Sequence, residues 1–188
     1  HKSIEIAKRQ VAAGALGVCC ATLAEAEVMA DGGVPGVLLF SSVVSEAKIN
    51  RLAALNMRSE GLMVAVDDTT NVNELAHAAR SMCKPLSMLV DYEVGGRRTG
   101  LVCEDAAIAL AKHICATEGA TYLGLQGYYG GLQSGPDFKE RSRLQAICVA
   151  PLARLIERLS AENMEPAIVT GGGSGTYEID PVQGVLTE

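Results

Sequence analysis

Aromatic residues and positive charge are both scarce in this chain. It has no tryptophan, aromatics make up 4% of its 188 residues, and the formal net charge is −6. Proteins that bind nucleic acid use a basic surface, and those that bind single strands add aromatic platforms on which bases stack. The composition therefore argues against a nucleic-acid partner. No uninterrupted apolar run approaches the roughly 18 residues of a transmembrane helix, so we expect no membrane partner either.

Metal-binding and disulfide motifs are also missing. The six cysteines include no CxxC pair and no zinc-finger spacing, and the three histidines form no HExxH pattern. In a chain this long and apolar, we interpret the cysteines as small buried hydrophobic residues of a reducing compartment, which predicts a cytoplasmic protein. His77 and His113 lie within predicted helices, far from any strand end, and we interpret both as structural. We assign no metal ligand within residues 1–188.

Apolar residues make up 48% of the sequence, and they fall into short runs that alternate with amphipathic segments. The runs predict strands, and the helical spacing of apolar residues between them predicts helices. The predicted strands cover residues 16–20, 36–40, 62–66, 86–90, 122–126, 168–169 and 184–187. The predicted helices cover residues 2–13, 23–30, 45–55, 71–82, 104–116 and 138–162. Pro151 could interrupt the last of these helices.

The predicted strands are apolar throughout, which is typical of a parallel sheet covered by helices on both faces. About seven strands alternating with helices suit either a doubly wound open sheet or a (β/α)8 barrel. The first predicted element is a helix with no strand before it, and one upstream strand would make eight. We therefore favour a TIM-like (β/α)8 barrel whose first strand is missing from this segment. Because the chain begins at His1 without Met, we expect it to be part of a longer polypeptide, with residues 1–188 forming one continuous barrel domain.

A glycine-rich loop follows the predicted strand at residues 168–169. It reads Gly171-Gly172-Gly173-Ser174-Gly175-Thr176. Glycine at this density serves either positive φ angles or close backbone approach, and free amides with two hydroxyls would suit a phosphate. The alternative is a tight turn with no ligand. No lysine follows the glycines, so the loop is neither a P-loop nor a dinucleotide fingerprint.

Polar residues follow the predicted strands, where a (β/α)8 barrel carries its reactive groups. Arg98 could reach inward to an oxyanion through its planar fork, whereas its neighbour Arg97 is the better candidate for a solvated surface residue. Tyr128 could donate a hydrogen bond or transfer a proton above a ligand, or could be only an aromatic at the rim. Asp67-Asp68 could be a carboxylate pair or a metal site, but we favour a helix cap before Asn71. Other polar residues at strand ends lie at 21–22, 41–42, 91–93 and 126–129.

Seven segments match, in order, the barrel domain of a known family. They lie at residues 1–3, 17–27, 64–68, 95–100, 124–128, 170–176 and 184–188. In these segments the chain resembles the D-threonine aldolase family. That family includes D-3-hydroxyaspartate aldolases and eukaryotic-type D-serine dehydratases, and it shares the alanine racemase-like fold of fold type III enzymes. The resemblance implies a barrel of the alanine racemase N-terminal type.

The resemblance also implies pyridoxal 5'-phosphate as the cofactor, held as a Schiff base by a lysine at the end of the first barrel strand. The family pattern there is His-x-Lys-x-His-Lys, and this chain starts at its second histidine. The Schiff-base lysine is therefore expected two residues before His1, and Lys2 is the later lysine of the pattern.

The resemblance assigns roles to residues within the chain. Arg98 matches an arginine near the phenolic oxygen of the cofactor, where it would favour the ionised oxygen. Tyr128 matches the residue that lines the cofactor face, and it is our candidate for a catalytic residue as well as a cofactor-binding one. The matches to the phosphate cup are Gly173, Ser174, Gly175 and Thr176.

The activity implied by the resemblance is retro-aldol cleavage of D-threonine-like amino acids to glycine and an aldehyde. It would use a divalent metal (Mn, Mg or Zn) bound outside this segment, by a C-terminal β domain after Glu188, and the protein would be a homodimer. Alternatives on the same fold are β-elimination of the D-serine dehydratase type, racemisation, or binding of pyridoxal phosphate without turnover. A phosphate-binding barrel enzyme of sugar metabolism is a further alternative. The chain departs from usual family residues at 21–22, 40–42 and 129–131, which bears on the substrate more than on the cofactor.

Overall fold

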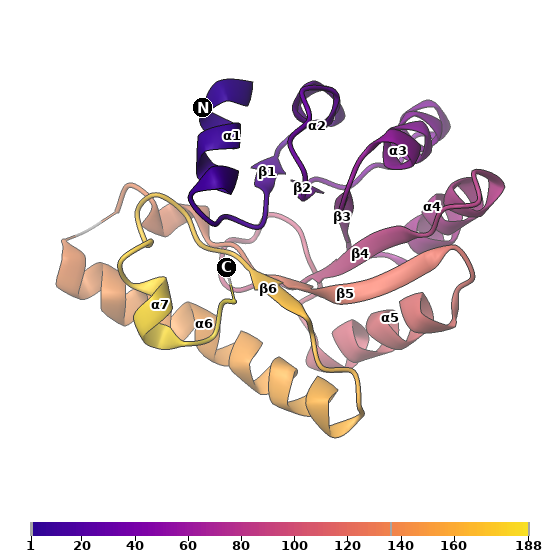
Figure 1. The fold of residues 1–188 in the computed structure, drawn as a ribbon. Coiled ribbons are helices and arrows are strands. Elements are labelled where there is room, and N and C mark those ends of the chain that lie inside the picture. Colours follow the sequence, from indigo (N-terminus) through magenta and orange to yellow (C-terminus); the bar gives the residue numbers. More distant parts are fainter. Residues whose placement is uncertain (1, 136, 188) are drawn as a thin grey trace. The chain divides into compact units, whose positions relative to one another are not determined.

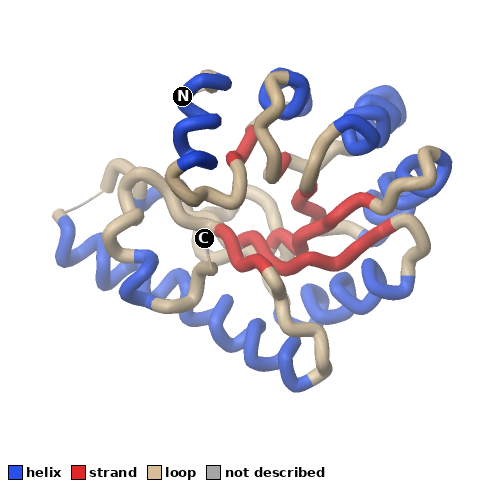
Figure 2. Tube along the Cα trace, viewed as in Figure 1, coloured by secondary structure: helices blue, strands red, loops and turns tan. Residues whose placement is uncertain are grey.

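The computed structural model describes residues 2–135 and 137–187, in which strands and helices alternate along the chain (Figure 1; strands red and helices blue in Figure 2). The strands are β1 (Val18–Cys20), β2 (Val37–Leu39), β3 (Met63–Val66), β4 (Leu86–Asp91), β5 (Ala120–Gln126) and β6 (Ile168–Thr170). The α-helices are α1 (Ile4–Ala12), α2 (Leu23–Asp31), α3 (Glu46–Arg58), α4 (Thr69–Ser81), α5 (Glu104–Ala116), α6 (Phe138–Ala161) and α7 (Asp180–Gln183). A short 3-10 helix, η1, covers Gly130–Leu132.

The sheet takes its six described strands in the order of the sequence, β1 to β6. β2 pairs in parallel with β1 and with β3, and β5 pairs in parallel with β6, with Leu125 opposite Val169. This arrangement confirms the α/β prediction. The chain divides into two compact units, residues 1–89 with 112–122 and residues 90–111 with 123–188.

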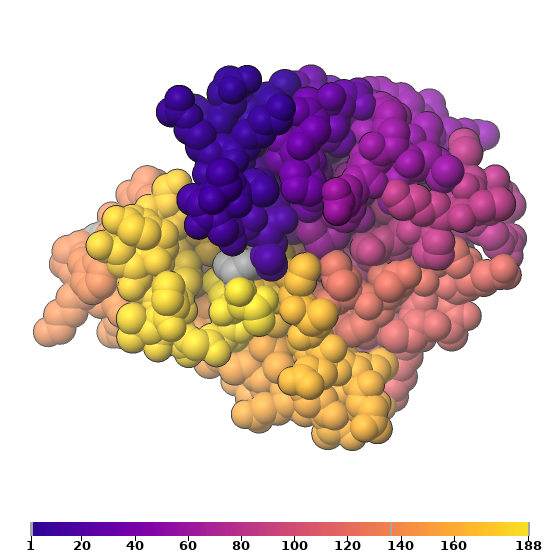
Figure 3. Space-filling view, viewed as in Figure 1, coloured from indigo at the N-terminus to yellow at the C-terminus, as the bar shows by residue number. Residues whose placement is uncertain are grey.

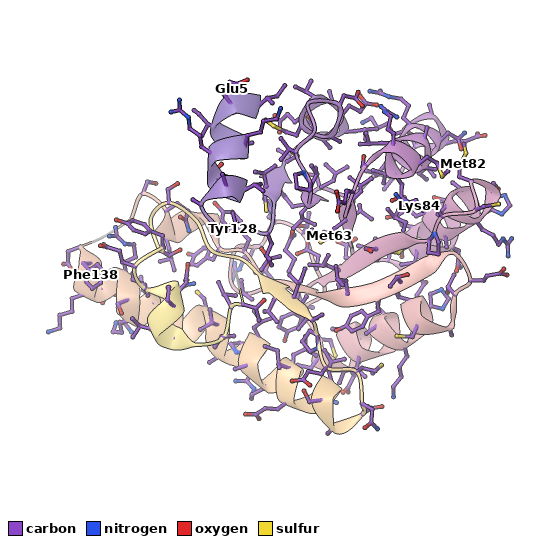
Figure 4. The ribbon with its side chains drawn as sticks, viewed as in Figure 1. Glu5, Met63, Met82, Lys84, Tyr128 and Phe138 are labelled. Carbon is purple, nitrogen blue, oxygen red and sulfur yellow. The ribbon has the colours of Figure 1, made fainter. Side chains whose placement is uncertain are left out.

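The first unit is built on strands that are buried along their whole length. Every residue of β2 and β3 is buried, as expected for parallel strands covered on both faces. Asp68 is the N-cap of α4, and its carboxylate accepts hydrogen bonds from the amides of Thr70 and Asn71 at 2.8 and 3.0 Å. This cap is the interpretation that the sequence favoured for Asp67-Asp68. Lys84, labelled in Figure 4, donates from Nζ to two carbonyls near the end of α3, those of Asn56 (2.6 Å) and Ser59 (2.8 Å).

The second unit contains the long helix α6, which continues through Pro151 as a single helix. The interruption considered at this proline is therefore not observed. The buried residues of this unit include Leu152, Leu155 and Leu159 of α6, together with Leu125 of β5 and Val169 of β6. α7 lies beside the first half of α6 (Figure 1), where the buried Gln145 donates to the Asp180 carboxylate at 2.6 Å.

The prediction of a strand at residues 184–187 is wrong. Residues 180–183 form α7, and the segment after it follows β6 without becoming a strand. The Thr187 amide donates to the Val169 carbonyl at 2.9 Å, but the Val169 amide donates to the Thr187 hydroxyl instead of to a carbonyl. Because a side chain takes this hydrogen bond, the backbone ladder is not established.

The prediction of buried cysteines holds for only two of the six. Cys20 and Cys148 are buried, and burial raises the pKa of the Cys20 thiol to about 11. The prediction is wrong for the exposed residues Cys19, Cys83, Cys103 and Cys115. Cys83 and Cys103 flank helix ends, where a small apolar side chain has no core to enter. All six are free thiols, and no helix within the described ranges is long and apolar enough to span a membrane.

Candidate functional site

The loop that carries Arg98 is closed at its base by backbone hydrogen bonds. The Leu101 amide donates to the Asp91 carbonyl at 2.9 Å, and the Glu93 amide donates to the Leu101 carbonyl at 3.0 Å. Gly100 lies within this closure at φ +99, where a Cβ atom would be 3.0 Å from the Glu93 nitrogen. Glycine is required here for both its conformation and its small size. The intervening residues therefore project as a loop beyond the carboxyl end of β4.

A buried carboxylate anchors this loop to the next strand. Asp91, the last residue of β4, is 5% exposed. Its Oδ2 accepts from the Thr99 hydroxyl at 2.7 Å, and its Oδ1 accepts from Nε2 of Gln126, the last residue of β5, at 3.0 Å. Hydrogen bonds to a charged group are stronger than neutral ones, so this network holds the Arg98 loop against the strand ends. The sequence placed both residues at strand ends but gave neither a role.

The network brings two predicted site residues together. The Arg98 guanidinium carbon lies 5.4 Å from the centroid of the Tyr128 ring, within the range of a cation–π interaction. Tyr128, labelled in Figure 4, follows β5 directly after Gly127. Arg98 is therefore a stacked side chain, although its residue is exposed, as is the neighbouring Arg97. The pair offers a positive charge and an aromatic face at the same place.

The four glycines of the loop after β6 each allow a close approach by another part of the chain. A Cβ atom at Gly171 would lie 2.0 Å from the Gly127 carbonyl oxygen, and one at Gly172 would lie 2.5 Å from an Asp180 carboxylate oxygen. A Cβ at Gly173 or Gly175 would lie 2.3 or 2.4 Å from an oxygen of Gln133. None of the four has φ in the left-handed region. Close approach, and not unusual backbone conformation, thus explains the glycines.

The turn at residues 173–176 closes around Thr176, which is 1% exposed. Its hydroxyl oxygen accepts from the Gly173 amide at 3.2 Å and from Nε2 of Gln133 at 3.4 Å. The Gly175 amide donates to Oε1 of Gln133 at 2.7 Å. Ser174 and Gly172 are exposed, and this C-terminal segment (yellow) lies at the surface of the face shown in Figure 3. The structure thus groups the predicted residues 173–176 in one turn, with Ser174 outside and Thr176 inside.

Gln133 is a residue of this site that the sequence did not reveal. It follows the 3-10 helix η1 and lies far from the glycine loop along the chain. No motif surrounds it, and its role depends on a contact that forms only in the folded chain. Its place in the turn is nonetheless defined by two hydrogen bonds from one carboxamide.

Lys2 is held as a charged amine. Its Nζ lies 2.5 Å from Oε1 of Glu25, whose other oxygen accepts from the Ala21 amide at 2.8 Å. The hydrogen bond to Glu25 raises the pKa of Lys2 above its usual 10.5, and the same hydrogen bond lowers the pKa of Glu25 below 4.5. A lysine that attacks a carbonyl must lose its proton, so this pairing makes Lys2 a poor nucleophile. Which lysine carries the cofactor stays a prediction.

No metal centre is found in the part of the chain that the structure describes, where no three His, Cys, Asp or Glu residues cluster suitably. His113 instead lies 2.8 Å from the Asn73 side chain, and His77 lies 3.4 Å from the Arg80 guanidinium. Both contacts lie at the surface, within the first unit.

Comparison with known proteins gives matches along the whole chain. The family described as "Alanine racemase, N-terminal domain" matches residues 1–185. The 3-hydroxy-D-aspartate aldolase of Paracoccus denitrificans (strain Pd 1222) is 34% identical over 189 residues, and the D-threonine aldolase of Arthrobacter sp. is 31% identical over 188 residues. Each alignment covers 100% of this chain and 49% of the relative. The crystal structure of D-threonine aldolase from Filomicrobium marinum matches with a TM-score of 0.95 and 36% identity, covering 100% of this chain and 51% of that one.

These matches confirm the predicted α/β barrel fold, since backbone and sequence agree over the entire chain. The chain spans about half the length of the relatives that it matches. The alignments extend over the Arg98 loop, Tyr128 and the glycine loop of this chain.

Proposed function

Because the chain belongs to the family of the alanine racemase N-terminal domain, we propose that it is the cofactor-binding barrel of a lyase that cleaves D-β-hydroxy-α-amino acids. The products would be glycine and an aldehyde when the substrate is D-threonine or similar. The observation that carries this proposal is the 31–36% identity to 3-hydroxy-D-aspartate and D-threonine aldolases over the whole chain. Those two names share a D-amino acid with a β-hydroxyl group.

The residues of the site fit pyridoxal 5'-phosphate. The cofactor combines a phosphate, an aromatic ring and an ionisable ring oxygen. The exposed Ser174 hydroxyl suits the phosphate, while Tyr128 offers an aromatic ring with the Arg98 guanidinium over one of its faces. All of these groups belong to one compact unit of the chain.

Within this proposal each residue has a defined task. When bound, pyridoxal phosphate supplies an electron sink for the charge left on the substrate α-carbon. Arg98 would supply positive charge to the ring oxygen of the cofactor, which would favour the ionised form of that oxygen. Tyr128 would hold the ring and shield it from water, and its hydroxyl is our candidate for proton transfer. The Ser174 hydroxyl, at the tip of the glycine turn, would bind the phosphate, while Asp91 and Thr99 position the Arg98 loop.

The proposal extends to parts of the protein beyond residues 1–188. We propose that the Schiff-base lysine precedes His1, and that a C-terminal β domain holds a divalent metal that polarises the substrate hydroxyl. Within the described ranges, no three His, Cys, Asp or Glu side chains cluster suitably for a metal ion. A homodimer in the cytoplasm remains part of the same proposal.

The test is to add pyridoxal phosphate to the purified full-length protein, follow its absorbance near the visible edge, and then supply D-threonine, D-3-hydroxyaspartate and D-serine. We expect a new absorbance band and release of glycine with an aldehyde. Release of a keto acid and ammonia would identify elimination instead, and an exchange of configuration would identify racemisation. A band without turnover would favour a binding protein, and no band would refute the cofactor.

A matched pair of variants tests the site itself. Arg98→Lys keeps the charge but loses the planar fork, so we expect kcat to fall by about tenfold or more. Arg97→Lys changes the exposed neighbour in the same loop and should leave kcat within about twofold, as surface substitutions usually do. Equal effects of the two substitutions would contradict the role given to Arg98.

A further inference from the structure

One side chain, that of Gln133, joins two loops of the second unit. It follows η1, in the connection between β5 and α6. Its Oε1 accepts from the Gly175 amide at 2.7 Å, and its Nε2 donates to the Thr176 hydroxyl oxygen at 3.4 Å. A single carboxamide thus engages two consecutive residues of the glycine loop, using its acceptor for one and its donor for the other.

At two of the loop glycines, the close neighbour is Gln133. A Cβ atom at Gly173 would lie 2.3 Å from Oε1 of Gln133, and one at Gly175 would lie 2.4 Å from its backbone carbonyl oxygen. Real Cβ atoms essentially never come within 3.0 Å of a heavy atom outside their own and the adjacent residues. Any side chain at either position would push Gln133 away, so this part of the glycine pattern matches the presence of the glutamine.

The contact shapes the part of the loop that faces solvent. Thr176 closes the turn by accepting from the Gly173 amide at 3.2 Å and by donating its own amide to the Gly173 carbonyl at 3.0 Å. Gln133 is hydrogen-bonded both to the Thr176 hydroxyl and to the Gly175 amide. Ser174 directly precedes Gly175, whose amide donates to Gln133. The carboxamide is neutral, so it orders the turn without placing negative charge beside an anion.

We propose that Gln133 is a positioning residue that orders the glycine loop before a phosphate group binds to it. A loop already held in its binding shape loses less conformational entropy on binding, which raises affinity without any new contact to the ligand. The identity of the ligand rests on the proposed function. The ordering of the loop does not, because both hydrogen bonds lie within the chain.

The first experiment uses the protein without cofactor. Gln133→Met keeps the length of the side chain and removes both hydrogen bonds, and Gln10→Met makes the same change at an exposed position of α1. Hydrogen–deuterium exchange of the segment at residues 171–177 is followed by mass spectrometry. We expect exchange there to be about fivefold to tenfold faster in Gln133→Met, the effect of losing about one net hydrogen bond. If the segment exchanged in Gln133→Met at the same rate as in wild type and in Gln10→Met, the proposal would be overturned.

The second experiment compares pyridoxal phosphate with pyridoxal, which lacks the phosphate. Gln133→Met should raise the Kd of pyridoxal phosphate about fivefold to tenfold and leave that of pyridoxal within about twofold, because only the phosphate uses the loop. Gln133→Glu keeps an acceptor for the Gly175 amide but adds negative charge. It should therefore keep the slow exchange of the segment and still weaken pyridoxal phosphate.

The outcomes separate this inference from the proposed function. Tighter binding of pyridoxal phosphate by Gln133→Met would show that Gln133 competes with the phosphate, which overturns the proposal. Equal weakening of both ligands would also overturn it, since the effect would not involve the phosphate. If wild-type protein bound neither ligand, the proposed function would fail, and the exchange measurement would still decide whether Gln133 orders the loop.

Discussion

Gly171→Ala should disrupt the junction between β6 and the glycine loop. Gly171 follows β6 directly, and an added Cβ atom would lie 2.0 Å from the carbonyl oxygen of Gly127 and 2.8 Å from its carbonyl carbon. Ordinary van der Waals contact begins at 3.4 Å. The new methyl group and a backbone carbonyl would therefore have to separate by more than an ångström. Neither atom belongs to a flexible side chain, so the backbone itself must move.

The movement would break a defined hydrogen bond. The Gly127 amide donates to the Thr170 carbonyl at 2.9 Å, one residue before the substitution. Overpacking a well-packed site typically costs about 1–3 kcal/mol, and we expect the upper part of this range because a carbonyl cannot rotate out of the way. The free energy of unfolding, measured by urea titration with circular dichroism, should fall by about 2–3 kcal/mol. Displacement of the loop should also raise the Kd of pyridoxal phosphate.

Gly96→Ala is the matched control in the same unit. Its added Cβ would lie 3.3 Å from the Tyr128 carbonyl oxygen, and Gly96 also has φ outside the left-handed region. Both substitutions gain about 0.4–1 kcal/mol from a less flexible unfolded chain, so their difference isolates the contact. We expect Gly96→Ala to stay within about 1 kcal/mol of wild type. Equal stability of the two variants would refute the steric argument.

Two further substitutions test the anchoring of the site loop and the Lys2–Glu25 ion pair. Thr99→Val removes the 2.7 Å hydrogen bond to the buried Asp91, so it should lower the free energy of unfolding in urea by about 1–2 kcal/mol. Thr99→Ser keeps the hydroxyl and should lower it by about half a kcal/mol or less. Equal losses of stability in the two variants would contradict the anchoring role. Glu25→Gln should lower the thermal midpoint at neutral pH, because pairing with Lys2 lowers the pKa of Glu25 and so stabilises the fold where the carboxylate is charged. This stabilisation is present above the ordinary pKa of 4.5 and is lost as the pH falls through the lower native pKa, so the midpoints of wild type and variant should converge on acidification. A gap that persists in acid would contradict the ion pair as its cause.

The alternation of strands and helices could be predicted from the sequence because it depends on local patterns. Runs such as Leu86 to Val90 are apolar on both faces, and the helix predicted at residues 104–116 has the bounds observed for α5. The failure at residues 184–187 has a different origin. Those residues are apolar and follow a short helix, but the Thr187 side chain takes the hydrogen bond that a strand neighbour would have made. A pattern of hydropathy does not contain that information.

Only part of the site could be predicted from the sequence, because some of its contacts form only when distant segments pack together. Arg98 and Tyr128 follow strand ends, so the topology alone brings them to one edge of the sheet, where they stack at 5.4 Å. Their roles toward a cofactor stay predictions. Gln133 gives no sign in the sequence, because its partners are about forty residues away and the contact depends on how two loops pack. Asp91 and Gln126 could be placed at strand ends, but their pairing required the register of β4 and β5.

The glycine loop shows why a motif can indicate the right site for an incomplete reason. Its glycines suggested a nest of free amides, yet the structure places a close neighbour at each one and engages the amides of Gly173 and Gly175 within the chain. The glycines therefore let neighbouring segments pack behind the turn, and the packing leaves Ser174 exposed at its tip. It follows that glycine content alone cannot separate a binding loop from a tight turn in this family. The residue that should distinguish them is Ser174, because it is exposed and its hydroxyl remains available to a phosphate when the amides on either side are used.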